Sequence, residues 1–199
     1  MKVPRILLPL VLCPTIVLAQ PGGSQPVAQP GAEKSFALLK SLAGTWQGSV
    51  QASSDELQPE VLPHKGNPWP AQVTLRVTSR GNAIVHEMWN PQVPDDPARY
   101  DHPTTVFYLD GDRLMLTHYC DMGNRPSMAA RSSPVGNTIE FDLVSISGPL
   151  KIGYMNQAIF TPADANHHGE DWMALVGGKT VKFHLTLQRQ PPGNAGSGQ

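Results

Sequence analysis

Apolar and polar residues alternate with a period of two along most of the chain, as they do on β-strands with one buried face. The clearest runs cover residues 73–78, 139–143 and 181–187, and turn signals such as Asp-Gly and Gly-Gly separate the runs. Nine segments are expected to form strands: 73–78, 83–89, 104–109, 113–120, 127–131, 139–143, 154–160, 172–176 and 181–187. The pattern therefore predicts nine or ten short strands joined by hairpins.

One short helix is expected before the strands. Phe36, Leu39 and Leu42 are spaced as on one face of a helix, and Ser35 is a suitable N-cap. Gly44 then interrupts the helical pattern. We expect the helix to cover residues 36–42.

This element order indicates an all-β fold, either a sandwich or an antiparallel up-and-down β-barrel of eight to ten strands with a short N-terminal helix. A closed barrel has no exposed strand edges, and about eight strands leave room for one small ligand. Two long irregular segments, 57–70 and 91–103, contain several prolines. They either surround the mouth of the barrel or form surface loops.

The first 19 residues have the features of a signal peptide. Lys2 and Arg5 precede an apolar run at 6–18, and Val-Leu-Ala at 17–19 suits cleavage after Ala19. About 13 apolar residues are too few to span a bilayer. We expect a signal peptide at 1–19, a flexible linker at 20–33, one domain at 34–189 and a disordered tail at 190–199. The protein is then exported, to the periplasm or beyond, without a stable membrane span; lipid attachment at Cys13 is the alternative.

Charge and cysteine content narrow the function classes. Removing Lys2 and Arg5 leaves 13 basic and 16 acidic residues, a net charge of −3. No basic stripe is present, which argues against nucleic-acid binding. Loss of Cys13 with the signal peptide leaves Cys120 without a disulfide partner in the chain. Cys120 is therefore buried, reactive or intermolecular, and a buried apolar thiol is the simplest of these.

Residues 42–48, Leu-Ala-Gly-Thr-Trp-Gln-Gly, resemble the start of lipocalin and calycin barrels. Those proteins begin with a short helix and a Gly-x-Trp motif in the first strand, and the indole closes one end of the barrel. An arginine late in the barrel often packs on that indole. The resemblance implies these structural roles for Gly44, Trp46 and Arg189, with a cation–π contact of about 0.5–2 kcal/mol.

Two further segments resemble uncharacterised exported bacterial proteins with this fold. Residues 109–126 match their Leu-Asp-Gly-Asp-Arg-Leu…His-Tyr-Cys…Gly-Asn-x-Pro pattern. Residues 160–179 match their Phe-x-x-x-Asp-Ala-x-His…Trp…Gly-Lys pattern. This resemblance covers most of residues 36–189 and implies a fold without an activity.

The last strand also resembles haem-binding barrels of the nitrobindin kind, which end in His-Leu-x-x-x-Leu-x-Arg with a haem-ligating histidine. Here the run from His184 to Arg189 is two residues shorter. Alternation places His184 on the polar outer face. In zinc-binding barrels several histidines share one pocket, whereas the adjacent His167 and His168 would point to opposite faces of a strand. The cofactor is left unassigned.

A histidine and the free thiol share one face of the strand at 113–120. Leu114, Leu116, His118 and Cys120 have the same parity. Because apolar residues of alternating strands face inward, we expect His118 and Cys120 inside the barrel or at its rim. Their spacing along one strand is too wide for a catalytic hydrogen bond between them.

The strand at 83–89 offers a carboxylate. If Val85 and Trp89 face inward, Glu87 does too, and a buried carboxylate needs a donor or a charged partner. His118 and Arg125 are the partners we expect, at one end of the barrel. The candidate ligand-binding residues are Glu87, His118, Cys120, Asn124 and Arg125.

The main hypothesis is an exported lipocalin-like barrel that binds a small, partly apolar molecule. One alternative is a barrel enzyme, or a metal- or haem-binding protein, that uses Glu87, His118 and Cys120. Another is a structural domain of the cell envelope without binding activity. No phosphate-binding Gly-rich loop, His-Glu-x-x-His motif or nucleophile elbow occurs in the sequence.

Overall fold

The computed structural model describes residues 31–54, 68–131 and 136–191. The expected signal peptide, most of the linker, most of the segment 57–70 and the tail from residue 192 lie outside the described residues. Among the described helices, none combines the length and the apolar character needed to cross a membrane.

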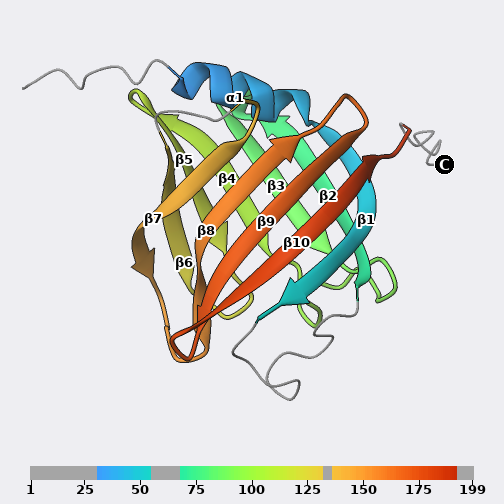
Figure 1. The fold of residues 1–199 in the computed structure, drawn as a ribbon, viewed down its shortest axis with the longest axis vertical. Helices are drawn as coiled ribbons and strands as arrows, with labels where there is room; N and C mark the ends of the chain where they lie inside the picture. Colours follow the sequence, from blue (N-terminus) through green and yellow to red (C-terminus); the bar gives the residue numbers. More distant parts are fainter. Residues whose placement is uncertain (1–30, 55–67, 132–135, 192–199) are drawn as a thin grey trace, which may run out of the picture.

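Ten antiparallel strands form one closed barrel in simple meander order, and β1 pairs with β10 to close it (Figure 1). The predicted up-and-down barrel is confirmed, and the sandwich alternative is wrong. In chain order the elements are α1 (Ala32–Ser41), β1 (Gly44–Ser53), β2 (Trp69–Thr78), the 3-10 turn η1 (Ser79–Gly81), β3 (Ala83–Trp89), β4 (Thr104–Asp110), β5 (Arg113–Tyr119), β6 (Arg125–Ala130), β7 (Ile139–Ser147), β8 (Gly153–Pro162), β9 (His167–Val176) and β10 (Lys179–Arg189).

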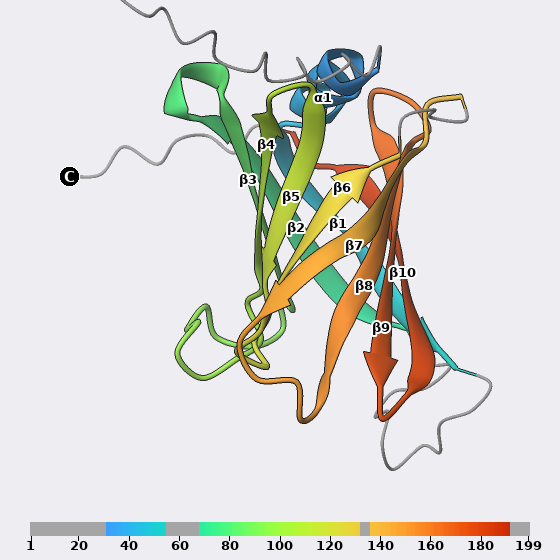
Figure 2. The ribbon, with the colours of Figure 1, turned by 90° about the vertical axis from the view of Figure 1, so that its left-hand side faces the viewer.

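Helix α1 lies across one end of the barrel (Figures 1 and 2). Its residues Phe36 and Leu39 are buried in the same apolar core as the inward-facing side chains of the strands. The helix begins at Ala32 and has Gly31 as its N-cap, without a side-chain capping bond. The predicted capping role of Ser35 is therefore wrong, because the buried face extends back to Ala32 and takes Ser35 into the helix.

Trp46 on β1 and Arg189 on β10 join the helix to the first and last strands of the barrel. The Trp46 indole is fully buried and donates a hydrogen bond from Nε1 to the carbonyl of Leu42 at 2.8 Å. The Arg189 guanidinium lies over the indole and donates to the carbonyls of Ser41 and Ala43 at the end of α1. The contact that the lipocalin resemblance implied is thus present.

Gly44 makes this approach possible. Its φ of +142° favours glycine, and a Cβ at this position would lie 2.7 Å from Nη1 of Arg189. A side chain at residue 44 would strain the backbone and displace the guanidinium from its place beside the chain.

The other end of the barrel carries long loops. The β3–β4 loop extends away from the barrel at the end opposite α1 (Figure 2). Asn124 is a buried residue of the β5–β6 loop. Its Nδ2 donates to the carbonyls of Pro149 and Gly153 at 3.2 and 2.7 Å. These bonds tie the β5–β6 loop to the β7–β8 loop.

Candidate functional site

A cavity of about 630 Å³ is lined by strand residues and by the β3–β4 loop, which lies at the end of the barrel opposite α1 (Figure 2). Residues of the β3–β4 loop contribute to its lining, as one of the two sequence interpretations of segment 91–103 expected. The lining combines aromatic, sulfur-containing and small apolar residues with a few polar and charged groups. Its aromatic, sulfur-containing, basic and acidic members are Trp69, Trp89, Tyr100, Trp172, Phe183, Met88, Met122, Met155, Cys120, His118, Arg99, Asp101 and Asp121.

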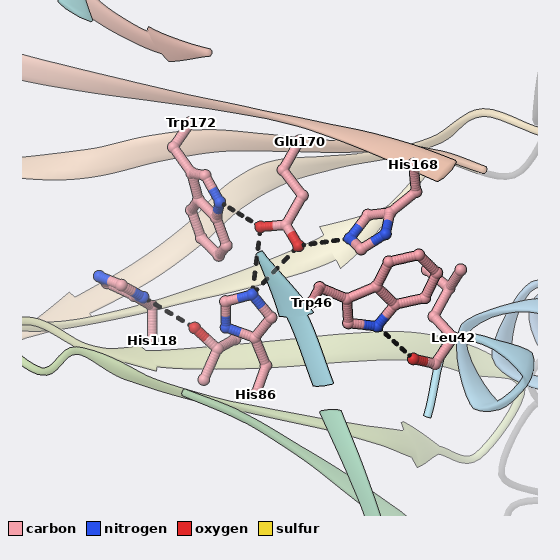
Figure 3. A network of polar contacts seen from close by, with 8 residues as sticks. Leu42, Trp46, His86, His118, His168, Glu170 and Trp172 are labelled. Atoms are coloured by element: carbon pink, nitrogen blue, oxygen red, sulfur yellow. Dashed lines mark hydrogen bonds and ion pairs between the residues drawn. The ribbon is translucent and has the colours of Figure 1, made fainter. Parts of the chain in front are cut away.

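His118, on strand β5, is one of the residues that line this cavity. Its side chain is 3% exposed, and Nδ1 lies 2.8 Å from the hydroxyl oxygen of Thr105 on the paired strand β4. Nε2 is buried and has no hydrogen-bond partner among the described residues. Figure 3 shows Nε2 pointing away from Glu170 and Trp46. A buried polar atom without a partner is costly, so a ligand that pairs with it would gain affinity.

Burial determines the charge of His118. Removal from water is the main cause and the nearby His86 the second, and together they lower its pKa to about 3. The imidazole is therefore neutral at physiological pH. In that state it can give or accept one hydrogen bond through Nε2, but it cannot balance a negative charge.

A buried carboxylate lies beyond Trp172, on the side of the barrel closer to α1 (Figure 3). Glu170 is 1% exposed and is bonded by three nitrogens: Nε2 of His86 at 3.1 Å, Nε2 of His168 at 3.0 Å and Nε1 of Trp172 at 3.0 Å. Burial alone would raise the Glu170 pKa. The two histidines outweigh burial and hold the pKa below its usual range, so the carboxylate is ionised.

The Glu170 network connects the closed end of the barrel to the cavity. His168 meets the Trp46 ring edge to face, with centroids 4.2 Å apart. Trp172 bonds to Glu170 and also packs against the His118 ring at 5.0 Å. Because its carboxylate has three donors, Glu170 holds the Trp172 ring in a fixed position as part of the cavity lining.

The structure brings together only part of the predicted site. His118 and Cys120 both line the cavity. Asn124 lies deeper in the loops and serves them through its two backbone bonds. Arg125 is exposed and donates to the hydroxyl of Ser147 on β7.

The predicted cluster of Glu87, His118 and Arg125 is wrong. On β3 it is Ile84 and His86 that are buried. Neighbouring residues of a strand point to opposite faces, so Glu87, next to His86, points to the outer face. The error has a physical cause: β3 carries apolar residues on both faces, and the sequence does not show which set is inside.

His86, His168 and Glu170 are functional candidates that the sequence reading missed. The signal for two of them was present, since His168, Glu170, Trp172 and Ala174 alternate along β9 and are all buried. Alternation with a buried tryptophan would have placed the carboxylate inside. The partner His86 lies 84 residues away from Glu170 and could not be paired with it by spacing.

The C-terminal histidine of haem-binding barrels has no counterpart inside this barrel. The His184 side chain is 50% exposed and its Nδ1 lies 2.6 Å from the Asp171 carboxylate on the outer face. The residues present at this position therefore do not fit a haem ligand. The described residues also contain no group of three or more His, Cys, Asp or Glu side chains placed to hold a metal ion.

Comparison with known proteins identifies the fold. No protein-family model matches the chain, and no curated protein matches it in sequence. The crystal structure of Rv2717c from M. tuberculosis is similar at a TM-score of 0.55 and 13% identity, over 79% of this chain and 98% of that one. A DUF3598 protein of unknown function from Nostoc punctiforme PCC 73102 matches at 0.47 and 9%, over 76% of this chain and 49% of that one. At these identities the likeness to Rv2717c shows an all-β barrel and nothing finer.

Proposed function

We propose that this protein is an exported, lipocalin-like barrel that binds a small, partly apolar molecule in the cavity at its open end. One observation carries the proposal: His118 is in the lining of a cavity of about 630 Å³, and its buried Nε2 has no hydrogen-bond partner among the described residues. A ligand is the group that would complete this atom.

The size and lining of the cavity support binding of a small molecule. Ligand sites are concave, about 300–1,000 Å³ in volume, and mostly apolar with a few placed polar groups. Trp172, Met155 and Phe183 supply apolar surface here, and His118 supplies a polar contact. The Glu170 network fixes Trp172, so the site is largely formed before a ligand arrives.

The lipocalin-like character and the exported location are parts of the same proposal. The helix across one end, the buried Trp46 and the arginine on its ring are the features that the lipocalin resemblance implied. The signal-peptide pattern of residues 1–19 supports export. Cleavage after Ala19 would be tested by N-terminal sequencing of the mature protein.

A titration with the neutral apolar dye Nile red tests binding in the cavity. We expect fluorescence enhancement with wild-type protein and at least a tenfold weaker response with Ala71→Phe, because Ala71 lines the cavity and a phenyl ring there fills it. Val144→Phe is the matched control, since Val144 is exposed on β7 and the same ring is added outside. Circular dichroism would establish that both variants are folded.

Native mass spectrometry of protein purified without denaturation would look for retained molecules. Equal dye binding by wild type and Ala71→Phe would contradict the proposal. Absence of both dye binding and a retained molecule would favour the structural envelope domain instead.

A further inference from the structure

We propose that the ligand is a small organic cation with a flat aromatic body, whose ring lies in the aromatic part of the cavity and whose charge lies beside Asp101 and Asp121. This inference rests on the proposed function and specifies its ligand class. It follows from three features of the cavity: its walls, its acidic groups and the uncharged His118.

The walls favour a flat ring over a flexible acyl chain. Five aromatic residues and three methionines line the cavity: Trp69, Trp89, Tyr100, Trp172, Phe183, Met88, Met122 and Met155. Aromatic faces and edges interact with another ring beyond the area that they bury, and thioethers also contact ring edges favourably. An acyl chain would gain only the area term. Aromatic faces also attract an organic cation directly.

The acidic groups set the sign of the charge. Asp101 and Asp121 are exposed residues at the edge of the cavity, whose lining includes both of them. Partial burial raises the pKa of Asp121, and the nearby Asp101 also raises it, against a lowering by the backbone N–H and the ring of His102. The two carboxylates therefore repel one another. A bound cation would relieve that repulsion, whereas a carboxylate ligand would add to it.

The bases near these carboxylates balance them only in part: Arg99 is in the lining, and His102 lowers the pKa of Asp121 through its backbone N–H and its ring. Arg99 lines the cavity but is largely exposed and lies 3.5 Å from the Asp96 carboxylate. His102 contributes its backbone N–H to Asp121 at 3.3 Å, while its ring lies 3.6 Å from Asp95. Counting Asp95 and Asp96 with the lining residues, this loop region carries four carboxylates and one arginine.

His118 excludes the reverse orientation with an anion at the inner end. Its imidazole is neutral and has one free position, Nε2. The inner end of the ligand is therefore uncharged and contributes at most one hydrogen bond there. Asp101 and Asp121 share one cavity lining with this buried, unpartnered side chain, so they are not an isolated acidic patch.

Three molecules with one ring system and different charges test the inference by isothermal titration calorimetry at pH 7.5. They are 2-naphthylmethylammonium, the neutral 2-naphthylmethanol and the anion 2-naphthoate. We expect affinity to fall in that order, with at least a tenfold difference between the cation and the anion, and the difference should shrink at high salt.

The double variant Asp101→Asn/Asp121→Asn should weaken the cation at least fivefold and leave the alcohol unchanged. Asp110→Asn/Asp112→Asn is the matched control, because it removes the same charge at the β4–β5 turn outside the cavity. Equal affinities, tighter binding of the anion, or equal loss of cation and alcohol in the double variant would overturn the inference. If none of the three probes binds while Nile red still does, the inference is overturned and the proposed function stands. If Nile red does not bind either, the inference and the proposed function are both overturned.

Discussion

The guanidinium carbon of Arg189 lies 4.1 Å from the ring centroid of Trp46, and the same two residues are register partners where β1 pairs with β10. The seam that closes the barrel and the contact that anchors α1 are therefore one structural unit. Arg189 also donates from Nε to the carbonyl of Ala165, so the unit includes the β8–β9 loop.

Replacing Trp46 with alanine should lower the free energy of unfolding by about 3–5 kcal/mol, the usual loss for a large buried aromatic side chain. Arg189→Ala should cost less, about 1–2 kcal/mol, because a cation–π contact and partly exposed hydrogen bonds are lost. Urea denaturation would measure both. Arg113→Ala is the control, since Arg113 is exposed and pairs only with Asp110 among the described residues; an equal effect of the two arginine variants would contradict the special role of Arg189.

The sequence predicted the barrel because alternation, hairpin turns and the Gly-x-Trp motif all report short-range structure. Leu114 and Leu116 placed His118 correctly by their shared parity, and the cavity lining confirms that position. The start of α1 was missed because the helix is stabilised by packing on the barrel end, which no capping residue signals.

The buried network could not be predicted in full because it depends on closure of the barrel. Strands β3 and β9 are not neighbours in the sheet, and His86 reaches Glu170 across the interior. Spacing along the chain says nothing about contacts across a barrel. On β3 itself, Ile84 and Val85 are equally suited to the core, so parity alone gave the wrong face for Glu87.

Glu170→Gln should destabilise the protein by about 3–5 kcal/mol. The change removes a buried charge from two histidines that were arranged around it, which is the costly way to break a buried ionic group. Asp171→Asn is a matched control on the adjacent residue. Asp171 pairs with Lys182 and His184 on the outer face, so its loss should cost less than about 1 kcal/mol. Similar effects of the two variants, measured by urea denaturation at pH 7, would contradict an ionised, structurally important Glu170.

Stability should fall as the pH is lowered below about 6.5, in part because of His118. Its pKa is lowered to about 3 in the folded protein, while the unfolded chain has an ordinary histidine pKa of about 6.5. Between these values the unfolded state binds the extra proton, so acid favours unfolding. The contribution approaches about 1.4 kcal/mol per pH unit in the middle of the range.

Denaturation of His118→Phe at a series of pH values isolates this contribution. The variant should show a smaller slope of stability against pH between about 4.5 and 6, whatever its absolute stability. Thr105→Val is the control, because it removes the hydroxyl bonded to Nδ1 and keeps the imidazole that titrates. Identical slopes for wild type and His118→Phe would mean that His118 is not held neutral by burial.

Cys120 should be a reduced thiol that reacts slowly in the native protein. Its side chain is partly buried at the cavity. Burial raises the pKa of the thiol, and the charges of Asp121 and Asp101 also raise it, while a hydrogen bond from the backbone of Met122 lowers it. Since the thiolate is the reactive form, alkylation by iodoacetamide at pH 8 should be about tenfold slower than in denatured protein. Asp101→Asn/Asp121→Asn should speed the native reaction, because the two charges that oppose thiolate formation are gone. Equal native and denatured rates, or a disulfide-linked dimer on a non-reducing gel, would contradict this assignment. A rate increase in the double variant would also mean that the charges of Asp101 and Asp121 act on the Cys120 thiol at the cavity. Binding of a cation beside these two carboxylates requires that their charges act there.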